Sequence, residues 1–161
     1  MRRLLVPLLA LAIVPTATAA LSVTLNSTSP QTFTAITLNG IDQTQTLPIS
    51  ITAANPNPAV ATGWNVTAAA GLPTSGSNTL SALQVTAVSA AGCTGGSCVN
   101  PTNNVALPVA LTAGGVKIFN AAANTGKGSV VLTATLQMTY DAKALPGNYT
   151  ASLTVAITAG P

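Results

Sequence analysis

The amino-acid sequence predicts an all-β protein, a two-sheet antiparallel β-sandwich of Ig-like architecture with about nine strands. Three observations lead to this prediction. Apolar and polar residues alternate with a period of two in many short segments, Thr and other β-branched residues are frequent in those segments, and Gly, Pro and Asn separate them. Short strands at regular spacing, with no segment of helical periodicity between them, are typical of two sheets packed face to face.

The predicted strands lie between the Gly, Pro and Asn residues that punctuate the chain. Two of them contain a proline, Pro48 or Pro108, which has no N–H to donate to a sheet ladder. Proline within a strand is found at a sheet edge or at a bulge, so we expect both strands in such positions. The predicted strands span residues 21–25, 32–38, 45–53, 63–69, 83–89, 105–111, 116–120, 129–139 and 148–158.

The segment 129–139 has the most regular alternation in the chain. Its even-numbered residues from Leu132 to Met138 are apolar, which assigns them to the buried face of a sheet. The segment 148–158 repeats the alternation. We expect these two strands to pair with each other through the connection between them.

The N-terminus has the composition of a secretory signal peptide. Two arginines precede an apolar run that ends at Val14, and small residues then lead to a cleavage site between Ala19 and Ala20. The apolar run has about 11 residues, fewer than the 18 or more of a membrane-spanning helix. We therefore expect residues 1–19 to be removed and residues 20–161 to form one secreted domain, with no transmembrane segment and no lipid anchor.

Charged residues are scarce in the chain. The full sequence has a formal net charge of +3, but two of its five basic residues belong to the leader. The remainder has three scattered lysines against two aspartates, a net charge of +1. Nucleic-acid binding needs a clustered basic surface, so the sequence excludes that class of partner. Hydrophobic residues make up 48% of the chain, which favours a folded domain over a disordered one.

The two cysteines, Cys93 and Cys98, bracket the sequence Thr-Gly-Gly-Ser. Because thiols oxidise outside the cytosol, we expect a disulfide between them. Closing so short a loop is worth roughly 2 kcal/mol, so the bond fixes a loop more than it holds the fold. A metal site is the alternative interpretation, but zinc takes about four Cys, His or acidic ligands, and the chain has no His and no further Cys. We expect no metal and no other cofactor.

Few residues in the chain are suited to catalysis. It has no His and no Glu, and its two aspartates, Asp42 and Asp141, lie far apart in contexts where Asp makes turn hydrogen bonds. The segment 124–129 contains the Gly-Lys pair of a phosphate loop, but Ala121 and Gly128 stand where that motif requires Gly and then Ser or Thr. We therefore expect a protein without enzymatic activity.

Three separate segments together resemble a known family. They are the strand that contains Trp64, the Ala- and Asn-rich turn with Gly126, and the last strand, which begins at Leu145-Pro-Gly-Asn-Tyr-Thr. In this order they resemble the WxL domain of Gram-positive surface proteins, over about residues 39–161. The first family motif, Trp-x-Leu, corresponds to Trp64-Asn65-Val66, and the second falls at Val155-Ala156-Ile157, which has no Trp.

The resemblance implies a β-rich domain that associates noncovalently with the cell wall, through peptidoglycan. Trp64 and Tyr149 are the aromatic candidates for contact with this wall polymer. A lone Trp among small residues on a strand is more often a packing residue than a sugar-stacking surface, so Trp64 has a structural interpretation beside the functional one. Tyr149 has the same two interpretations.

Two functions remain open from the sequence. In the first, the protein is a binding module associated with the cell wall. In the second, it is a structural subunit that assembles with itself or with other surface proteins into a surface layer or a pilin-like fibre, for which low charge and Thr-rich strand edges are suited. Fractionation separates the two, because a wall module appears as monomers that rebind purified wall sacculi, whereas a fibre subunit appears as a ladder of oligomers.

Overall fold

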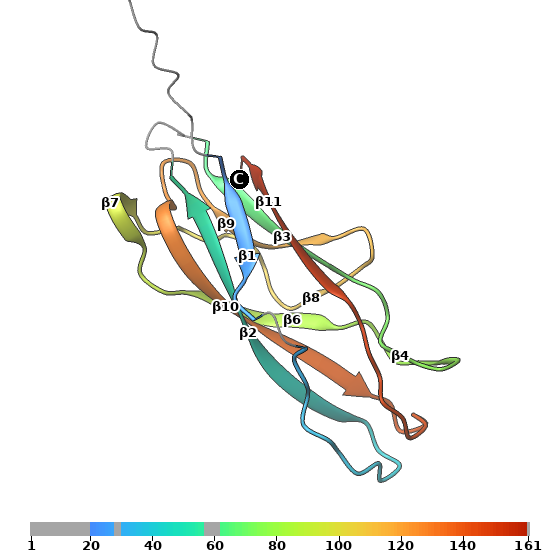
Figure 1. Cartoon of the computed structure of the whole chain (residues 1–161). Coiled ribbons are helices and arrows are strands. Elements are labelled where there is room, and N and C mark those ends of the chain that lie inside the picture. The colour runs from blue at the N-terminus through green and yellow to red at the C-terminus, as the bar shows by residue number, and fades with distance from the viewer. Residues whose placement is uncertain (1–19, 28–29, 57–61, 161) are drawn as a thin grey trace, which may run out of the picture.

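The computed structural model describes residues 20–27, 30–56 and 62–160 (Figure 1). Within these ranges every regular element is a β-strand, and every ladder between strands is antiparallel. The all-β prediction is therefore confirmed. No helix long and apolar enough to cross a membrane occurs in the described part of the chain. The expected signal peptide at residues 1–19 lies outside the described residues.

The larger sheet is built around two long strands that run side by side (Figure 1). β2 (Gln43–Asn55) and β10 (Lys127–Tyr140) pair from Gln43–Tyr140 at one end to Asn55–Gly128 at the other. The other strands of this sheet are shorter, so within the described ranges part of β2 has a neighbouring strand on one side only. The order is β1 (Ser22–Leu25), β2, β10, β6 (Gln84–Ala90) and β8 (Val109–Ala110), and β7 (Thr94–Val99) pairs with β10 beyond the end of β6.

The smaller sheet contains the last strand of the chain. Its order is β11 (Leu153–Ala159), β3 (Trp64–Ala70) and β9 (Val116–Ala121), and β4 (Thr74–Ser75) and β5 (Asn78–Thr79) form a separate hairpin. The prediction that the last two long strands pair with each other is wrong, because β10 lies in the larger sheet and β11 pairs with β3. The connection between them carries the chain from one sheet to the other.

Both sheets contribute side chains to one hydrophobic core. The apolar residues of β10 from Leu132 to Met138 are at most 4% exposed, so the predicted buried face is confirmed. Along the margins, β1 approaches β11, while β6 and β8 approach β9. The core includes Ile51, Val85, Val130 and Leu132 from the larger sheet and Trp64, Val66, Ile118 and Phe119 from the smaller one.

The segment 32–38 differs from its prediction. It forms no strand, and none of its backbone groups joins a sheet ladder within the described residues. Only Val109–Ala110 of the predicted strand 105–111 is paired, and the loop expected around the cysteines instead contains the short strand β7.

Both prolines that interrupt predicted strands lie at sheet edges, as expected. Pro48 is in β2 at a point where, among the described residues, β10 is the only neighbouring strand, because the ladder with β1 ends at the pair Leu25–Ile51. Pro108 immediately precedes β8, the last strand on the other side of the sheet. The missing N–H of Pro48 therefore costs β2 no hydrogen bond to β1, and Pro108 lies just outside the ladder of β8 with β6.

Candidate functional site

Trp64 lies in the core at the start of β3 and is 1% exposed. Its ring packs against that of Phe119, with 5.7 Å between the ring centroids. The indole Nε1 donates a hydrogen bond of 2.7 Å to the carbonyl oxygen of Gly126, which satisfies the one polar atom of the side chain. Trp64 is therefore a packing residue in this fold, and its indole has no exposed face for a wall polymer.

The turn before β10 is built closely around this indole. Gly126 has a φ of 66°, and a Cβ at this position would lie 2.6 Å from Nε1 of Trp64 and 2.5 Å from Cβ of Ala121. Both the backbone conformation and the space therefore require glycine. β3 lies between β9 and β11 in the smaller sheet. In its ladder with β11, Trp64 is opposite Ala159 and Val66 is opposite Ile157. The three segments that carry the family resemblance thus meet in one place.

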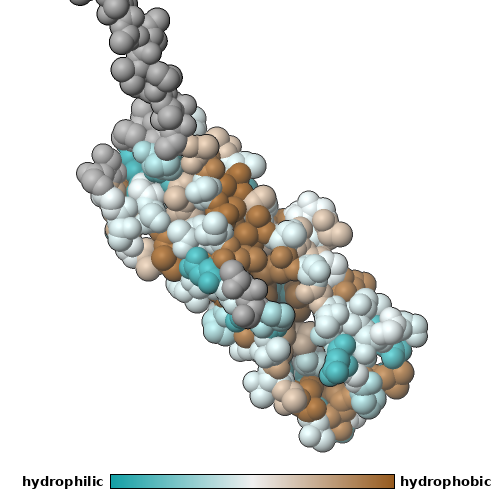
Figure 2. All heavy atoms as spheres, viewed as in Figure 1, coloured by the Kyte–Doolittle hydropathy of each residue, from teal (hydrophilic) through white to brown (hydrophobic). Residues whose placement is uncertain are grey.

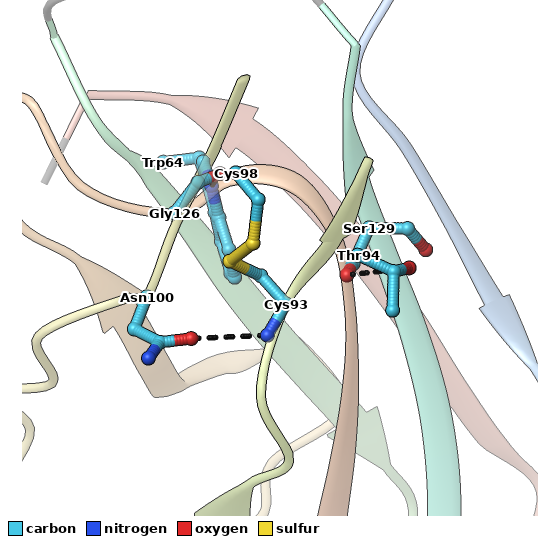
Figure 3. The surroundings of a disulfide bond; sticks show 7 residues. All are labelled: Trp64, Cys93, Thr94, Cys98, Asn100, Gly126 and Ser129. Atoms are coloured by element: carbon cyan, nitrogen blue, oxygen red, sulfur yellow. Dashed lines mark hydrogen bonds between the residues drawn. A yellow bond between two sulfur atoms is a disulfide. The ribbon is translucent and has the colours of Figure 1, made fainter. Parts of the chain in front are cut away.

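Cys93 and Cys98 form the predicted disulfide, with their Cα atoms 5.8 Å apart (Figure 3). The bond joins Cys93, immediately before β7, to Cys98 within β7. This strand pairs with β10 at Thr94–Ser129. The backbone N–H of Cys93 donates to Oδ1 of Asn100 at 3.0 Å, as Figure 3 also shows. The disulfide therefore fixes a short strand at the margin of the larger sheet.

We expect replacement of both cysteines by Ser to lower the free energy of unfolding by about 2 kcal/mol or less, because the closed loop is short. The effect should be local, so amide hydrogen exchange in β7 should accelerate while exchange in the core of β2 and β10 changes little. Chemical denaturation measures the change in the free energy of unfolding, and hydrogen exchange shows whether the change is confined to β7. A loss of cooperative unfolding in the double variant, or free thiols in the native protein, would contradict a local role of the disulfide.

Tyr149 is half-buried in the connection before β11. Its hydroxyl donates a hydrogen bond of 2.8 Å to the carbonyl oxygen of Leu145, and its ring meets that of Tyr140 edge to face, with 6.4 Å between centroids. Burial raises the pKa of Tyr140 above its usual value, and the neighbouring Tyr149 raises it further. The charged phenolate form of Tyr140 is therefore even less favoured than that of an ordinary tyrosine, which is itself uncharged at neutral pH.

The two tyrosines lie at a groove in the protein that we call the apolar groove. It has a volume of about 940 Å³ and is lined by residues 30–38, by the connection 145–151 and by inward-facing side chains of β2 and β10. Among the residues that the structure describes, no charged one lines it. Among its apolar walls are Leu47, Ile49, Leu136 and Met138. Figure 2 shows hydrophobic residues gathered along the middle of one face of the molecule and again towards its far end.

The two aspartates, distant in sequence, come to the same end of the larger sheet, because the ladder pairs Gln43 with Tyr140. Oδ1 of Asp42 accepts a hydrogen bond of 2.7 Å from the backbone N–H of Ala142, and Oδ2 of Asp141 accepts one of 3.5 Å from the Ser81 hydroxyl. Both carboxylates are exposed and take part in loop hydrogen bonds. In the described part of the chain, no group of His, Cys, Asp and Glu residues is arranged to hold a metal ion.

Sequence reasoning identified Trp64, the disulfide and Tyr149, but not the groove or the proximity of the aspartates. The groove forms from segments far apart in the chain, so no local pattern indicates it. No protein-family model matches the chain, and neither the curated proteins nor the solved structures include a match.

Proposed function

We propose that this chain is a secreted, non-catalytic module that associates noncovalently with the bacterial cell wall, through peptidoglycan. The observation that carries the proposal is the meeting of the three motif segments. Trp64 donates to Gly126 of the turn and pairs across the sheet with Ala159 of the last strand. Because the segments act as one structural unit, their joint occurrence in the sequence supports a fold shared with WxL domains, and with it their mode of wall association.

The proposed architecture is an Ig-like sandwich. Two antiparallel sheets with one common core and adjacent margins support it. The hydrogen bond from Tyr149 to a backbone carbonyl four residues upstream also resembles the tyrosine corner of Greek-key sandwiches. This contact gives Tyr149 a structural role in addition to any contact with a ligand.

In this proposal the wall polymer contacts the protein at Tyr149 and the apolar groove, not at Trp64. Tyr149 is half-buried, and its ring lies in the wall of the groove, where a sugar ring can stack on it. The absence of charged residues in the lining suits an uncharged glycan face better than the anionic parts of a wall.

Sedimentation with purified wall sacculi tests the proposal. We expect the secreted protein to sediment with sacculi, and Tyr149→Ala to weaken retention by about 10-fold or more, which corresponds to about 1.4 kcal/mol. Tyr149→Phe keeps the ring and should retain most of the binding. Val131→Ala, a change at an exposed residue of β10, is the matched control and should bind like the parent. A parent protein that stays in the supernatant would refute the proposal.

Self-assembly is a second candidate function, and a specific observation favours it. The outer edge of β2 beyond its ladder with β1 has no partner strand within the described residues. An open strand edge is a template for pairing with another chain. A ladder of oligomers that resists mild dissociation is the expected result for such a subunit.

A further inference from the structure

Asn39 stands directly before Gly40 in the connection that leads to β2, and this is the single Asn-Gly pair of the sequence. Both residues are exposed to solvent. Asparagine is a thermolabile residue, because the backbone nitrogen of the next residue can attack its side-chain carbonyl carbon. Glycine in the next position has no side chain to hinder that attack. The pair is therefore the place in the chain where this intramolecular reaction meets least steric hindrance.

The backbone nitrogen of Gly40 is free to react. Its N–H donates no hydrogen bond to another residue in the part of the chain that the structure describes, and Gly40 lies outside the strand ladders. A base in water can therefore remove the proton of this N–H without breaking a hydrogen bond of the fold. Most backbone N–H groups of β2 and β10, in contrast, are held in ladders.

Two donors hold the side chain of Asn39. The backbone N–H of Ile41 donates a hydrogen bond of 3.2 Å to Oδ1 of Asn39, and Nε2 of Gln43 donates one of 2.9 Å to the same oxygen. The first bond closes a turn in which the side chain folds back over the Asn39–Gly40 peptide. When the nitrogen of Gly40 attacks Cγ, negative charge develops on Oδ1, where both donors already point. They therefore stabilise the transition state of the attack more than its ground state.

Two other asparagines are the natural comparison. Asn148 is exposed, but the residue after it is Tyr149, whose side chain hinders the attacking nitrogen. Asn26 is exposed too, but its side chain is held by β2, because Nδ2 donates to the Ser50 hydroxyl at 2.6 Å and Oδ1 accepts from the Thr52 hydroxyl at 2.8 Å. We therefore expect both to react more slowly than Asn39.

We propose that Asn39 is a site of spontaneous deamidation, with water as the co-reactant. The nitrogen of Gly40 gives its proton to a base in solution and forms a bond to Cγ of Asn39. The Cγ–Nδ2 bond then breaks, and Nδ2 takes a proton from water and leaves as ammonia. A water molecule opens the cyclic imide, at one carbonyl to give aspartate and at the other to give isoaspartate. Neither step oxidises or reduces the protein.

Either product adds one negative charge to the end of the larger sheet at which Asp42 and Asp141 lie. The net charge of residues 20–161 falls from +1 to zero. The protein therefore exists in two charge forms, and the ratio of the two reports the time that it has spent in water at a given pH and temperature.

Incubation of the purified protein in mildly alkaline buffer, followed by isoelectric focusing and peptide mapping by mass spectrometry, tests the proposal. We expect one acidic form to accumulate, with aspartate and isoaspartate in place of Asn39 and with the amide of Asn148 intact. The rate should rise with pH, because the attacking nitrogen must lose its proton. Asn39→Asp should focus with the acidic form from the start. The incubation lasts until a synthetic peptide of residues 36–43 has converted, so an amide that persists at Asn39, or earlier conversion at Asn148, would overturn the proposal.

Gln43→Leu tests the role of the hydrogen bonds to Oδ1. We expect deamidation of Asn39 to slow by about 2- to 10-fold, because one hydrogen bond to the developing charge is lost. Gln137→Leu, in β10 of the same sheet, is the matched control, since its side chain makes no hydrogen bond among the described residues, and it should react at the rate of the parent. Equal or faster conversion in Gln43→Leu would show that the bond restrains the side chain instead, which overturns its stabilising role.

Discussion

Trp64→Ala is expected to lower the free energy of unfolding by about 3 to 5 kcal/mol. The indole is 1% exposed and packs against Phe119, so its removal leaves a cavity between the sheets. It also leaves the carbonyl of Gly126 without its hydrogen-bond donor. Since single domains have about 5 to 15 kcal/mol of stability, the variant should be largely unfolded well below the melting temperature of the parent.

Chemical denaturation followed by circular dichroism measures this effect. Trp64→Phe keeps an aromatic ring against Phe119 but removes the donor, so we expect a smaller loss of about 1 to 3 kcal/mol. Val131→Ala, at an exposed residue of β10, should change stability by about 0.5 kcal/mol or less. A melting temperature of Trp64→Ala within a few degrees of the parent would contradict the packing role of this residue.

Gly126→Ala has the second largest expected effect, a loss of about 2 to 4 kcal/mol. One part of the loss is conformational, because a residue with a Cβ is strained at a φ of 66°. The other part is steric, because the Cβ would lie 2.6 Å from Nε1 of Trp64 and 2.5 Å from Cβ of Ala121. The neighbouring indole cannot move away without losing its own hydrogen bond.

A second variant, Gly40→Ala, separates the conformational part of the stability loss from the steric part. Gly40 has a φ of 79°, but a Cβ there would meet no atom within 4 Å. We therefore expect this control to lose only the conformational part, about 1 to 2 kcal/mol. Equal losses in the two variants, measured by chemical denaturation, would show that the Gly126 turn does not pack against Trp64.

The sequence predicted the faces of the strands better than their partners. Alternation in β10 assigned Leu132 to Met138 to the core correctly, because burial of one face requires a period of two. The same alternation cannot specify which of the two sheets a strand joins, so it predicts the wrong neighbour for β11, which pairs with β3 and not with β10. The connection 141–152 is long enough to cross between sheets.

The segment 32–38 shows a second limit of local pattern. Its sequence suits a strand, but a strand also needs ladder hydrogen bonds to a neighbour, and within the described residues this segment joins no ladder. Asp42 and Asp141 show a third limit, because their proximity depends on the register of β2 with β10. Trp64 and the disulfide were predictable because each depends on local composition: small residues around an aromatic ring, and a short loop between two cysteines.

Trp64, the turn at Gly126 and the last strand form one structural unit, and we propose that ligand contact lies elsewhere. Fluorescence of the native protein distinguishes a buried from an exposed Trp64, because Trp64 is the single Trp of the chain and the signal has one source. A buried indole 1% exposed should emit at shorter wavelength than free Trp, should be quenched poorly by iodide, and should not change when wall sacculi are added. Emission like that of free Trp with efficient quenching by iodide, or a strong change on addition of sacculi, would contradict the claim and would move the binding site to Trp64.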